Sequence, residues 1–352
     1  MPRDTRRAFL AELDKVSPQI ARAFEEAIQD VRSTAQMRVI EEAIERAIRT
    51  GNIGQGVREV TAALQLGAEF FAPLDQSIDA AFRAGAVYQL STLPKPSSNT
   101  APYLQVRFQG RHPRAEAWTR TAAARLITEV TLDTQEVIRG TIAEAVEQSR
   151  SYRKVAQDLI GRTEGNQRKG GLIGLHSRQA AAVRKARAEL EELDSSYFRR
   201  EKRDRRFDPM IRKAIKDGKS LARADIDRIT GRYSDRLLKV RADTIARTEG
   251  NGAMNAGRHE STQQMIDDGK VPVEAVTKIW DATPGPRTRD SHRALNGQEI
   301  RWGEMFVSPV TGALLAHPHD ENAPAAETVN CRCSERIRID WAMVARIARR
   351  AA

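Results

Sequence analysis

Histidine and cysteine gather near the end of the sequence, in a segment rich in turn-forming residues. Both cysteines and three of the six histidines fall within residues 280–333. Imidazole nitrogen and thiolate sulfur are ligands that zinc prefers in proteins. Cys331 and Cys333 are two residues apart, so on a strand both side chains would point to one face. We therefore predict a structural zinc site with both cysteines and His292 as ligands. The fourth ligand is expected among His317, His319 and Asp320.

The same residues admit other interpretations. A Cys-x-Cys pair lacks the tight turn of paired Cys-x-x-Cys motifs, so the thiols could be a reduced pair, one of them buried, beside surface histidines. A thiolate beside a histidine could also be a nucleophile, and a zinc ion with an open position could activate water for phosphodiester cleavage, with Asp290 or Asp320 as base. The sequence contains no recognisable catalytic turn, so we expect no enzyme. A disulfide between residues two apart is strained, so we expect reduced thiols and cytoplasmic synthesis.

Positive charge is concentrated in one central stretch of the chain. The formal net charge is +11, and residues 161–240 carry 22 Lys and Arg against 12 Asp and Glu. Such a segment is typical of a polyanion partner, most simply DNA phosphates, bound without base reading. The alternative is a solvated helical segment with internal ion pairs, anchored by the aromatic residues at both ends of the run 197–207. The candidate DNA contacts are Arg199, Arg200, Lys202, Arg203, Arg205 and Arg206.

Apolar periodicity predicts helices through most of the first 260 residues, and the pattern changes after Gly269. Gly51 should end one of these helices, because glycine is common directly after a helix. The expected helical stretches are 20–31, 40–48, 55–90, 114–160 and 177–250. Alternating or β-branched residues predict strands instead. The expected strands are 103–108, 275–280, 299–307 and 327–339.

These patterns predict an α+β fold, with mostly α-helical N-terminal and central regions and a small α+β C-terminal domain. No apolar run is long enough to span a membrane, and no secretion signal is recognisable. The expected parts are a helical region 1–93, a linker 94–102 rich in proline and serine, a helical region 103–240 with the basic segment, a small domain 241–340 and a basic tail 341–352.

Small residues dominate one side of the stretch 246–258. They would let a helix approach another backbone closely, or the polar residues Arg247, Glu249 and Asn251 would form a bonded network at that point. The sequence Arg-Thr-Glu-Gly-Asn at 247–251 also occurs at 162–166. One such pair does not indicate a repeat architecture.

A series of short motifs in residues 240–340 resembles the phage Mu protein F-like family of head-morphogenesis proteins. The series begins with Ile245-Ala246-Arg247-Thr248-Glu249 and Trp280, continues through Arg289-Asp290-Ser291-His292, Leu295-Asn296-Gly297, Phe306 and Pro318-His319-Asp320, and ends with Val329-Asn330-Cys331-Arg332-Cys333. Each motif alone is common, but their combined order is specific. Members of the family often carry an acidic residue a few positions before the Arg-x-x-His element, where this chain has Pro284-Gly285-Pro286.

The resemblance implies a bacteriophage virion protein. More specifically, it implies a minor capsid protein that belongs to the head of a tailed phage and is associated with the portal. Its expected partners are the portal and capsid proteins and, through the basic segment, packaged DNA. The expected location is inside the head near the portal, and the host cytoplasm during assembly. The resemblance also implies a structural cluster, possible metal ligands included, at His292, Asn330, Cys331, Cys333 and Asp320. The other motif positions that it singles out are Arg247, Thr248, Glu249 and Trp280. A metal-dependent nuclease or toxin-like enzyme built on the His/Cys cluster is the alternative function.

Overall fold

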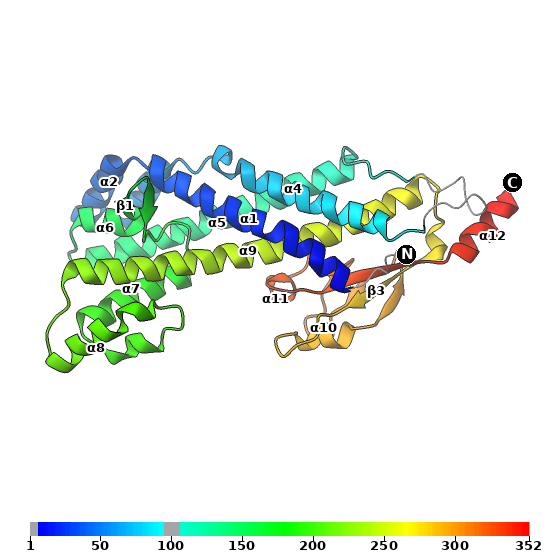
Figure 1. The fold of residues 1–352 in the computed structure, drawn as a ribbon. Helices are drawn as coiled ribbons and strands as arrows, with labels where there is room; N and C mark the ends of the chain where they lie inside the picture. The colour runs from blue at the N-terminus through cyan, green and yellow to red at the C-terminus, as the bar shows by residue number, and fades with distance from the viewer. Residues whose placement is uncertain (1–5, 95–105, 352) are drawn as a thin grey trace. The chain divides into compact units, whose positions relative to one another are not determined.

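Long helices account for most of the chain, as the apolar periodicity predicts. The computed structural model describes residues 6–94 and 106–351, and these residues form a mostly helical protein with small antiparallel sheets (Figure 1), which confirms the expected α+β class. None of the described helices is long and apolar enough to cross a membrane. The helices are α1 (Arg6–Thr34), α2 (Met37–Thr50), α3 (Ile53–Leu64), α4 (Ala68–Ser91), α5 (Pro113–Glu147), α6 (Tyr152–Ile160), α7 (Ser177–Glu191), α8 (Asp208–Asp217), α9 (Arg223–Asp267), α10 (Asp290–Leu295), α11 (Ala325–Thr328) and α12 (Trp341–Ala351).

The strands are short, and every pairing between them is antiparallel. β3 (Val276–Asp281) is the middle strand of a three-stranded sheet, between β4 (Glu299–Arg301) and β7 (Ser334–Ile339). The other sheets are two hairpins. They are formed by β1 (Arg162–Glu164) with β2 (Gln167–Lys169), and by β5 (Phe306–Val307) with β6 (Leu314–Leu315).

Glycine and aspartate set several of the local boundaries. Gly51 follows α2 with φ +68°, which confirms the predicted helix end, since glycine adopts this left-handed conformation at little cost. The charged run 197–207 is not the long helix we expected. It forms two 3₁₀ turns, Ser195–Arg199 and Arg205–Phe207, because Asp194 and Asp204 each accept a hydrogen bond from the backbone two residues later and so start a new turn.

Two of the predicted strands differ from the structure, and a third lies largely outside the described residues. The stretch 327–339 holds the end of α11, a turn over 329–333 and then β7, and the stretch 299–307 is divided into β4 and β5. Strand 103–108 and the linker 94–102 lie largely outside the described residues, and 106–108 form no strand. The stretch 299–307 is interrupted where Glu304 accepts a hydrogen bond from the backbone of Arg301 and closes a turn. The stretch 327–339 begins later than predicted because Glu327 lies at the end of α11, where its carboxylate contacts His292.

The described chain divides into two compact units, each assembled from separate segments. The central unit comprises residues 22–73 and 124–242, and the C-terminal unit comprises the described parts of 1–21, 74–123 and 243–352. Helix α9 runs without a break through residue 241, where the sequence suggested a boundary.

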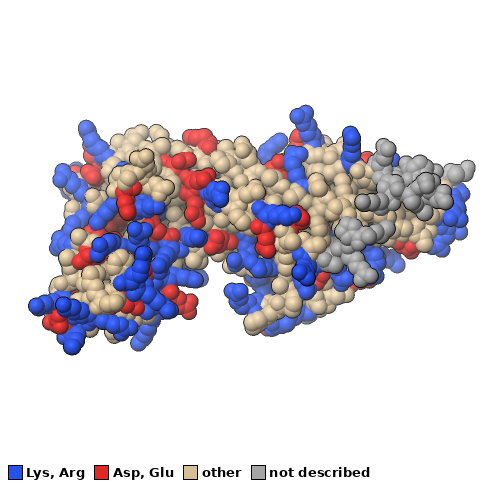
Figure 2. Space-filling view, in the orientation of Figure 1, with Lys and Arg blue, Asp and Glu red and all other residues tan. Residues whose placement is uncertain are grey.

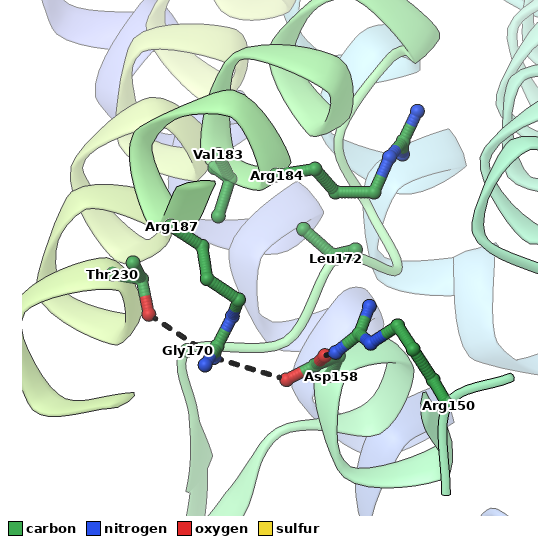
Figure 3. A pocket seen from close by; sticks show the side chains of 8 residues that line it. All are labelled: Arg150, Asp158, Gly170, Leu172, Val183, Arg184, Arg187 and Thr230. Carbon is green, nitrogen blue, oxygen red and sulfur yellow. Dashed lines mark hydrogen bonds and ion pairs between the residues drawn. The ribbon is translucent and has the colours of Figure 1, made fainter. Parts of the chain in front are cut away.

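Ion pairs between arginines and carboxylates hold the interior of the central unit. Arg187 on α7 contacts Asp158 of α6 at 3.2 Å and Asp227 of α9 at 2.6 Å, and Arg150 reaches the other oxygen of Asp158 at 2.6 Å. Arg150, Asp158 and Arg187 line a small hollow (Figure 3) together with Arg184, which pairs with a glutamate of α5. Part of the positive charge in the basic segment is therefore neutralised inside the protein and is not free to bind a partner.

In the C-terminal unit, α4 and α9 pack backbone against backbone. A Cβ atom added to Gly257 would lie 1.9 Å from the carbonyl oxygen of Phe82, and one added to Gly85 would lie 2.1 Å from that of Met254. No side chain fits between the two helices at these positions. The structure thus confirms the close approach that the small residues of 246–258 predict.

Candidate metal centre

Short elements of the C-terminal unit bring three of the predicted ligands together. His292 lies on α10, Cys331 in the turn after α11, and Cys333 directly before β7. Strand β3 pairs with β7 and carries Trp280, which packs with both cysteines in a buried apolar cluster. The exposed fractions of His292, Cys331 and Cys333 are 1%, 4% and 2%, so all three are shielded from water.

The ring nitrogen Nδ1 of His292 faces both sulfur atoms. It lies 3.3 Å from Sγ of Cys331 and 3.4 Å from Sγ of Cys333, and the three atoms lie within 4.8 Å of one another. Around a tetrahedral zinc ion, bond lengths of about 2.3 Å to sulfur and about 2.1 Å to nitrogen place ligand N and S atoms about 3.6 Å apart. The distances found here are slightly shorter than this edge, so the group could hold a metal ion after a small expansion.

Glu327 fixes the orientation of the His292 ring. Its carboxylate, 1% exposed, accepts a hydrogen bond of 2.8 Å from Nε2 of His292. It also accepts hydrogen bonds from Ser291 (3.0 Å), Ser308 (2.7 Å) and Thr311 (2.7 Å). Because Nε2 carries the proton, Nδ1 keeps a free lone pair toward the two sulfurs. Metal-binding histidines commonly have this outer carboxylate, and it orients the ring and strengthens it as a ligand.

The electrostatics of the site favour one thiolate. Burial raises the pKa of Glu327, but the hydrogen bonds from Ser308, Thr311 and Ser291 outweigh it, and the carboxyl pKa lies below its usual value. The hydrogen bond from the thiol of Cys331 holds the pKa of Cys333 below its usual value despite burial, while the same hydrogen bond and burial raise the pKa of Cys331. A thiolate is the form of cysteine that binds a metal, so Cys333 is ready for that role.

Two asparagines of α9 hold the backbone of the cysteine turn. The Nδ2 group of Asn251 donates to the carbonyl oxygens of Cys331 (3.2 Å) and Cys333 (3.1 Å), and Asn255 donates to the latter at 3.3 Å. Both asparagines are fully buried. The turn between α11 and β7 is thereby tied to a long helix, which limits the movement of the two sulfur atoms.

The predicted motif residues meet at the same turn. Asn330 has a left-handed backbone with φ +59°, its N–H donates to Oγ1 of Thr248 at 3.1 Å, and its Oδ1 accepts from Arg247 at 2.9 Å. Trp280 lies below the turn in the apolar cluster, and Glu249 is half-buried on the same helix as Thr248. The polar network suggested for 247–251 therefore includes Arg247 and Asn251, both of which bind the cysteine turn.

The three other predicted metal ligands lie outside this group of atoms. His319 is buried, and its ring nitrogen Nε2 contacts the carbonyl oxygen of Cys331 at 2.9 Å, while burial lowers its pKa to about 3. His317 contacts the carbonyl oxygen of Pro318. Asp320 accepts hydrogen bonds from the backbone of Ala316 and Asn322, so it closes a turn. The structure brings together three side chains that could bind a metal ion, and it gives His317, His319 and Asp320 contacts in the surrounding loop.

Comparison with known proteins places the centre in a family context. Residues 206–336 match the family model described as "Phage Mu protein F like protein". This segment belongs to the phage Mu protein F-like family. A 98-residue stretch is also 37% identical to the protein named "Minor head protein GP7" of Bacillus phage SPP1, covering 28% of this chain and 30% of that protein. The match thus spans less than a third of the relative's length. No solved structure matches the chain.

The Mu F-like segment contains all three metal-centre residues, Asn251 and Asn255, and it begins at the last of the candidate DNA contacts. Among those contacts, Arg200 pairs with Glu189 and Arg203 with Asp208, and the side chains of both arginines are 12% exposed. Arg206 is exposed and pairs with Asp204. The remaining contacts are exposed and form no ion pair with any residue that the structure describes. These are Arg199, Lys202 and Arg205.

Sequence reasoning missed the outer residues of the metal centre. Glu327 lies four positions before Cys331, and on the predicted strand 327–339 both side chains would share one face, but this spacing does not distinguish a hydrogen-bond partner of His292 from a surface glutamate. Ser308 and Thr311 lie in the β5–β6 hairpin, where no spacing pattern relates them to the ligands. The one relevant signal in the sequence is the position of this glutamate, between Ala325-Ala326 and the Asn-Cys-x-Cys motif at 330–333.

Proposed function

We propose that the chain is a minor structural protein of a tailed-phage head, bound at the portal vertex and acting in head assembly, with a further role in DNA packaging or delivery. The observation that carries this is the Mu F-like segment 206–336, together with its similarity to a minor head protein of SPP1. The partners would be the portal and capsid proteins. The protein would reside inside the head near the portal, and in the host cytoplasm during assembly.

Association with the portal is tested in phage particles. In mature particles disrupted under mild conditions, antibody against the chain should recover portal protein, and portal antibody should recover the chain. Recovery of major capsid protein without portal protein would contradict the portal location. Absence of the chain from purified heads would contradict a virion role altogether.

We further propose that the basic segment contacts packaged DNA through the exposed side chains of Arg199, Lys202 and Arg205. In Figure 2, Lys and Arg side chains crowd the surface of the part that carries α7 and α8. Substitution of all three by glutamine should weaken binding of the full chain to a labelled duplex. It should also reduce the slope of log affinity against log salt by up to about 2.7, since each lost phosphate contact removes about 0.9.

The matched control for this test removes three exposed arginines elsewhere in the central unit. The triple variant Arg38→Gln, Arg49→Gln, Arg58→Gln changes the net charge equally and should leave the salt slope close to that of the wild type. Equal losses in both triple variants would assign the effect to overall charge and contradict the local contact. The full chain is used because the central unit also needs residues 22–73 and 124–160.

The ion in the metal centre is proposed to be zinc in a structural role. Two sulfurs and one imidazole are soft-to-borderline ligands that favour zinc over magnesium or calcium. Protein purified without chelators should contain close to one zinc per chain by elemental analysis. Less than about a tenth of that amount, with none taken up from added zinc, would leave the cysteines as part of the apolar core.

The alternative, a metal-dependent nuclease or toxin-like enzyme, has one feature in its favour, because Cys333 has a lowered pKa. However, Cys333 is 2% exposed and the carboxylate of Glu327 already accepts four hydrogen bonds, so neither group is available to a substrate or a water molecule. Incubation of the protein with plasmid and divalent metals should leave the DNA intact. Cleavage that is lost in His292→Ala would reverse this ranking.

A further inference from the structure

Four arginines surround the outer side of the cysteine turn. Arg332 lies between the two cysteines, Arg247 lies on α9, and Arg287 and Arg289 lie in the loop before α10. Arg287 and Arg332 are exposed, and the other two are half-buried. None of the four forms an ion pair with a carboxylate within the described part of the chain.

Hydrogen bonds hold this group in place from three directions. Arg247 donates to Oδ1 of Asn330, and Arg289 donates to the carbonyl oxygen of Val329. Thr283, at the start of the loop, donates from its hydroxyl to the carbonyl oxygen of Arg332. The loop before α10 and the cysteine turn are thus bonded to each other and to α9, which brings the segments that carry the four arginines together.

The positive charges are close enough to affect one another. Burial lowers the pKa of Arg247, and the charges of Arg332 and Arg287 lower it further, while only Asp243 acts in the opposite direction. Arg293, on α10, is already paired with Asp290. Uncompensated guanidinium groups that repel one another are stabilised when an anion binds among them.

We propose that Arg247, Arg287, Arg289 and Arg332 form a second binding surface for DNA phosphates, which the metal centre holds in position. This inference deepens the proposed DNA contact, and it assigns that contact to the Mu F-like domain itself in addition to the segment 199–205. Guanidinium groups suit phosphate oxygens because they donate two parallel hydrogen bonds.

A phosphate backbone fits this surface better than a protein partner does. Protein interfaces have an apolar centre, and a group of four exposed apolar side chains lies instead on the β5–β6 hairpin and its flanks, at Met305, Val307, Val310 and Leu314. Beside the arginines, the loop presents Pro284, Gly285 and Pro286, and Val329, 38% exposed, is the one large aliphatic side chain next to them among the exposed residues that the structure describes. Four cations with few apolar neighbours are typical of phosphate contacts that carry no base specificity.

The metal enters because the same short turn carries two ligands and one arginine. Arg332 lies between Cys331 and Cys333, and Arg289 is three residues before His292. A bound ion would link α10, which directly follows the loop, to the cysteine turn through coordinate bonds, and so limit the movement of Arg289 and Arg332 relative to each other. Without the ion, the two segments are held by hydrogen bonds and by the apolar cluster around Trp280, and the arginines are less well organised for a phosphate.

The test measures binding of the zinc-loaded full chain to a labelled 30-base-pair duplex by fluorescence anisotropy between 50 and 200 mM KCl. The double variant Arg287→Gln, Arg332→Gln removes two exposed side chains that are not needed to hold the turn. It should weaken binding three- to tenfold at 100 mM salt and reduce the salt slope by up to about 1.8. The control, Arg301→Gln with Arg338→Gln, removes two exposed arginines of β4 and β7 and should have little effect.

Removal of zinc by a chelator provides the second measurement. Metal-free wild type should bind DNA as weakly as the zinc-loaded double variant, and metal removal should have little further effect on that variant. Undiminished binding by the metal-free wild type would contradict the role of the metal. Circular dichroism spectra before and after chelation would show whether the helices remain folded.

Other outcomes separate this inference from the proposed function. If Arg199→Gln, Lys202→Gln, Arg205→Gln loses binding while Arg287→Gln, Arg332→Gln matches its control, the second surface is refuted and the first contact stands. If the wild type binds no duplex even at 50 mM salt, both are refuted. If the double variant binds DNA normally but loses portal protein, the surface recognises an acidic protein instead, and the inference is wrong.

Discussion

Replacement of Glu327 by glutamine tests the architecture of the metal centre at its most informative position. The substitution keeps the size of the side chain but removes its charge and one of its two acceptor oxygens. The carboxylate now receives hydrogen bonds from His292, Ser291, Ser308 and Thr311. In Glu327→Gln, the two hydroxyl groups that face the new NH₂ group must rotate so that their oxygens accept hydrogen bonds from it. The ring of His292 also loses a charged partner.

The expected effect has two parts. Loss of the outer carboxylate typically lowers metal affinity 10- to 100-fold, which corresponds to about 1.4–2.7 kcal/mol at about 1.4 kcal/mol per tenfold. A hydrogen bond to a charged group contributes about 1.5–3 kcal/mol, so the metal-free protein should lose stability by about 1–3 kcal/mol after the hydroxyls rearrange. The stability difference between the two proteins should therefore be larger with zinc than without it.

Competition with a chromophoric chelator measures the zinc affinity, and urea denaturation with and without zinc measures the two stabilities. Glu274→Gln is the control, because Glu274 is an exposed glutamate of the same unit and lies outside the centre. His292→Ala marks the loss of a ligand and should abolish tight binding. The orienting role of the carboxylate would be refuted if Glu327→Gln bound zinc as tightly as the wild type while His292→Ala did not bind zinc tightly.

Two further predictions concern the packing around α9. Gly257→Ala should lower the free energy of unfolding by about 2–3 kcal/mol in urea denaturation, because its Cβ would meet the carbonyl oxygen of Phe82. The control Gly303→Ala has open space around the new Cβ and should be nearly neutral. Equal stability of the two variants would contradict the close helix contact. Burial and the nearby charges of His317 and Lys278 hold the pKa of His259 well below 6.5, so the folded state binds its proton less readily than the unfolded chain. The free energy of unfolding should therefore fall as the pH drops below about 6.5, by at most about 1.4 kcal/mol per pH unit. Urea denaturation at pH 7.5 and 5.0 should show a smaller pH dependence for His259→Gln than for the wild type. An unchanged pH dependence of stability in this variant would assign the effect to other groups.

The sequence predicts the helices well because their signals are local. Gly51 ends α2 as expected, and the small residues of 246–258 meet α4 as expected. The prediction fails where tertiary contacts decide the conformation. The pentapeptide Arg-Thr-Glu-Gly-Asn begins the β1–β2 hairpin at 162–166, where Gly165 has φ +62°, and is helical at 247–251, where Asn251 is buried against the cysteine turn. No local property distinguishes the two copies.

Three members of the candidate site could be predicted from the sequence, whereas the expected fourth ligand and the surroundings of the site could not. Residue type and order identify His292, Cys331 and Cys333, because few other residues bind soft metal ions. Glu327 and Asn255 were not identified, since glutamate and asparagine are common and their roles depend on the pairing of elements far apart in the sequence. The same limit applies to the basic segment, where spacing does not reveal that Arg200 and Arg203 are occupied by carboxylates.

The outer layer of the metal centre bears on the choice between a structural and a catalytic role. A catalytic metal needs an open position that a substrate can reach, and a free base nearby. Here the ligands are nearly inaccessible, the one carboxylate beside the ring is saturated, and the carbonyl oxygens of both cysteines are bound by α9. The same features suit an ion that joins α10 to the turn before β7. Loss of the ion should therefore lower the stability of the C-terminal unit and disturb the arrangement of the surface arginines. Any loss of DNA binding should follow from these two changes.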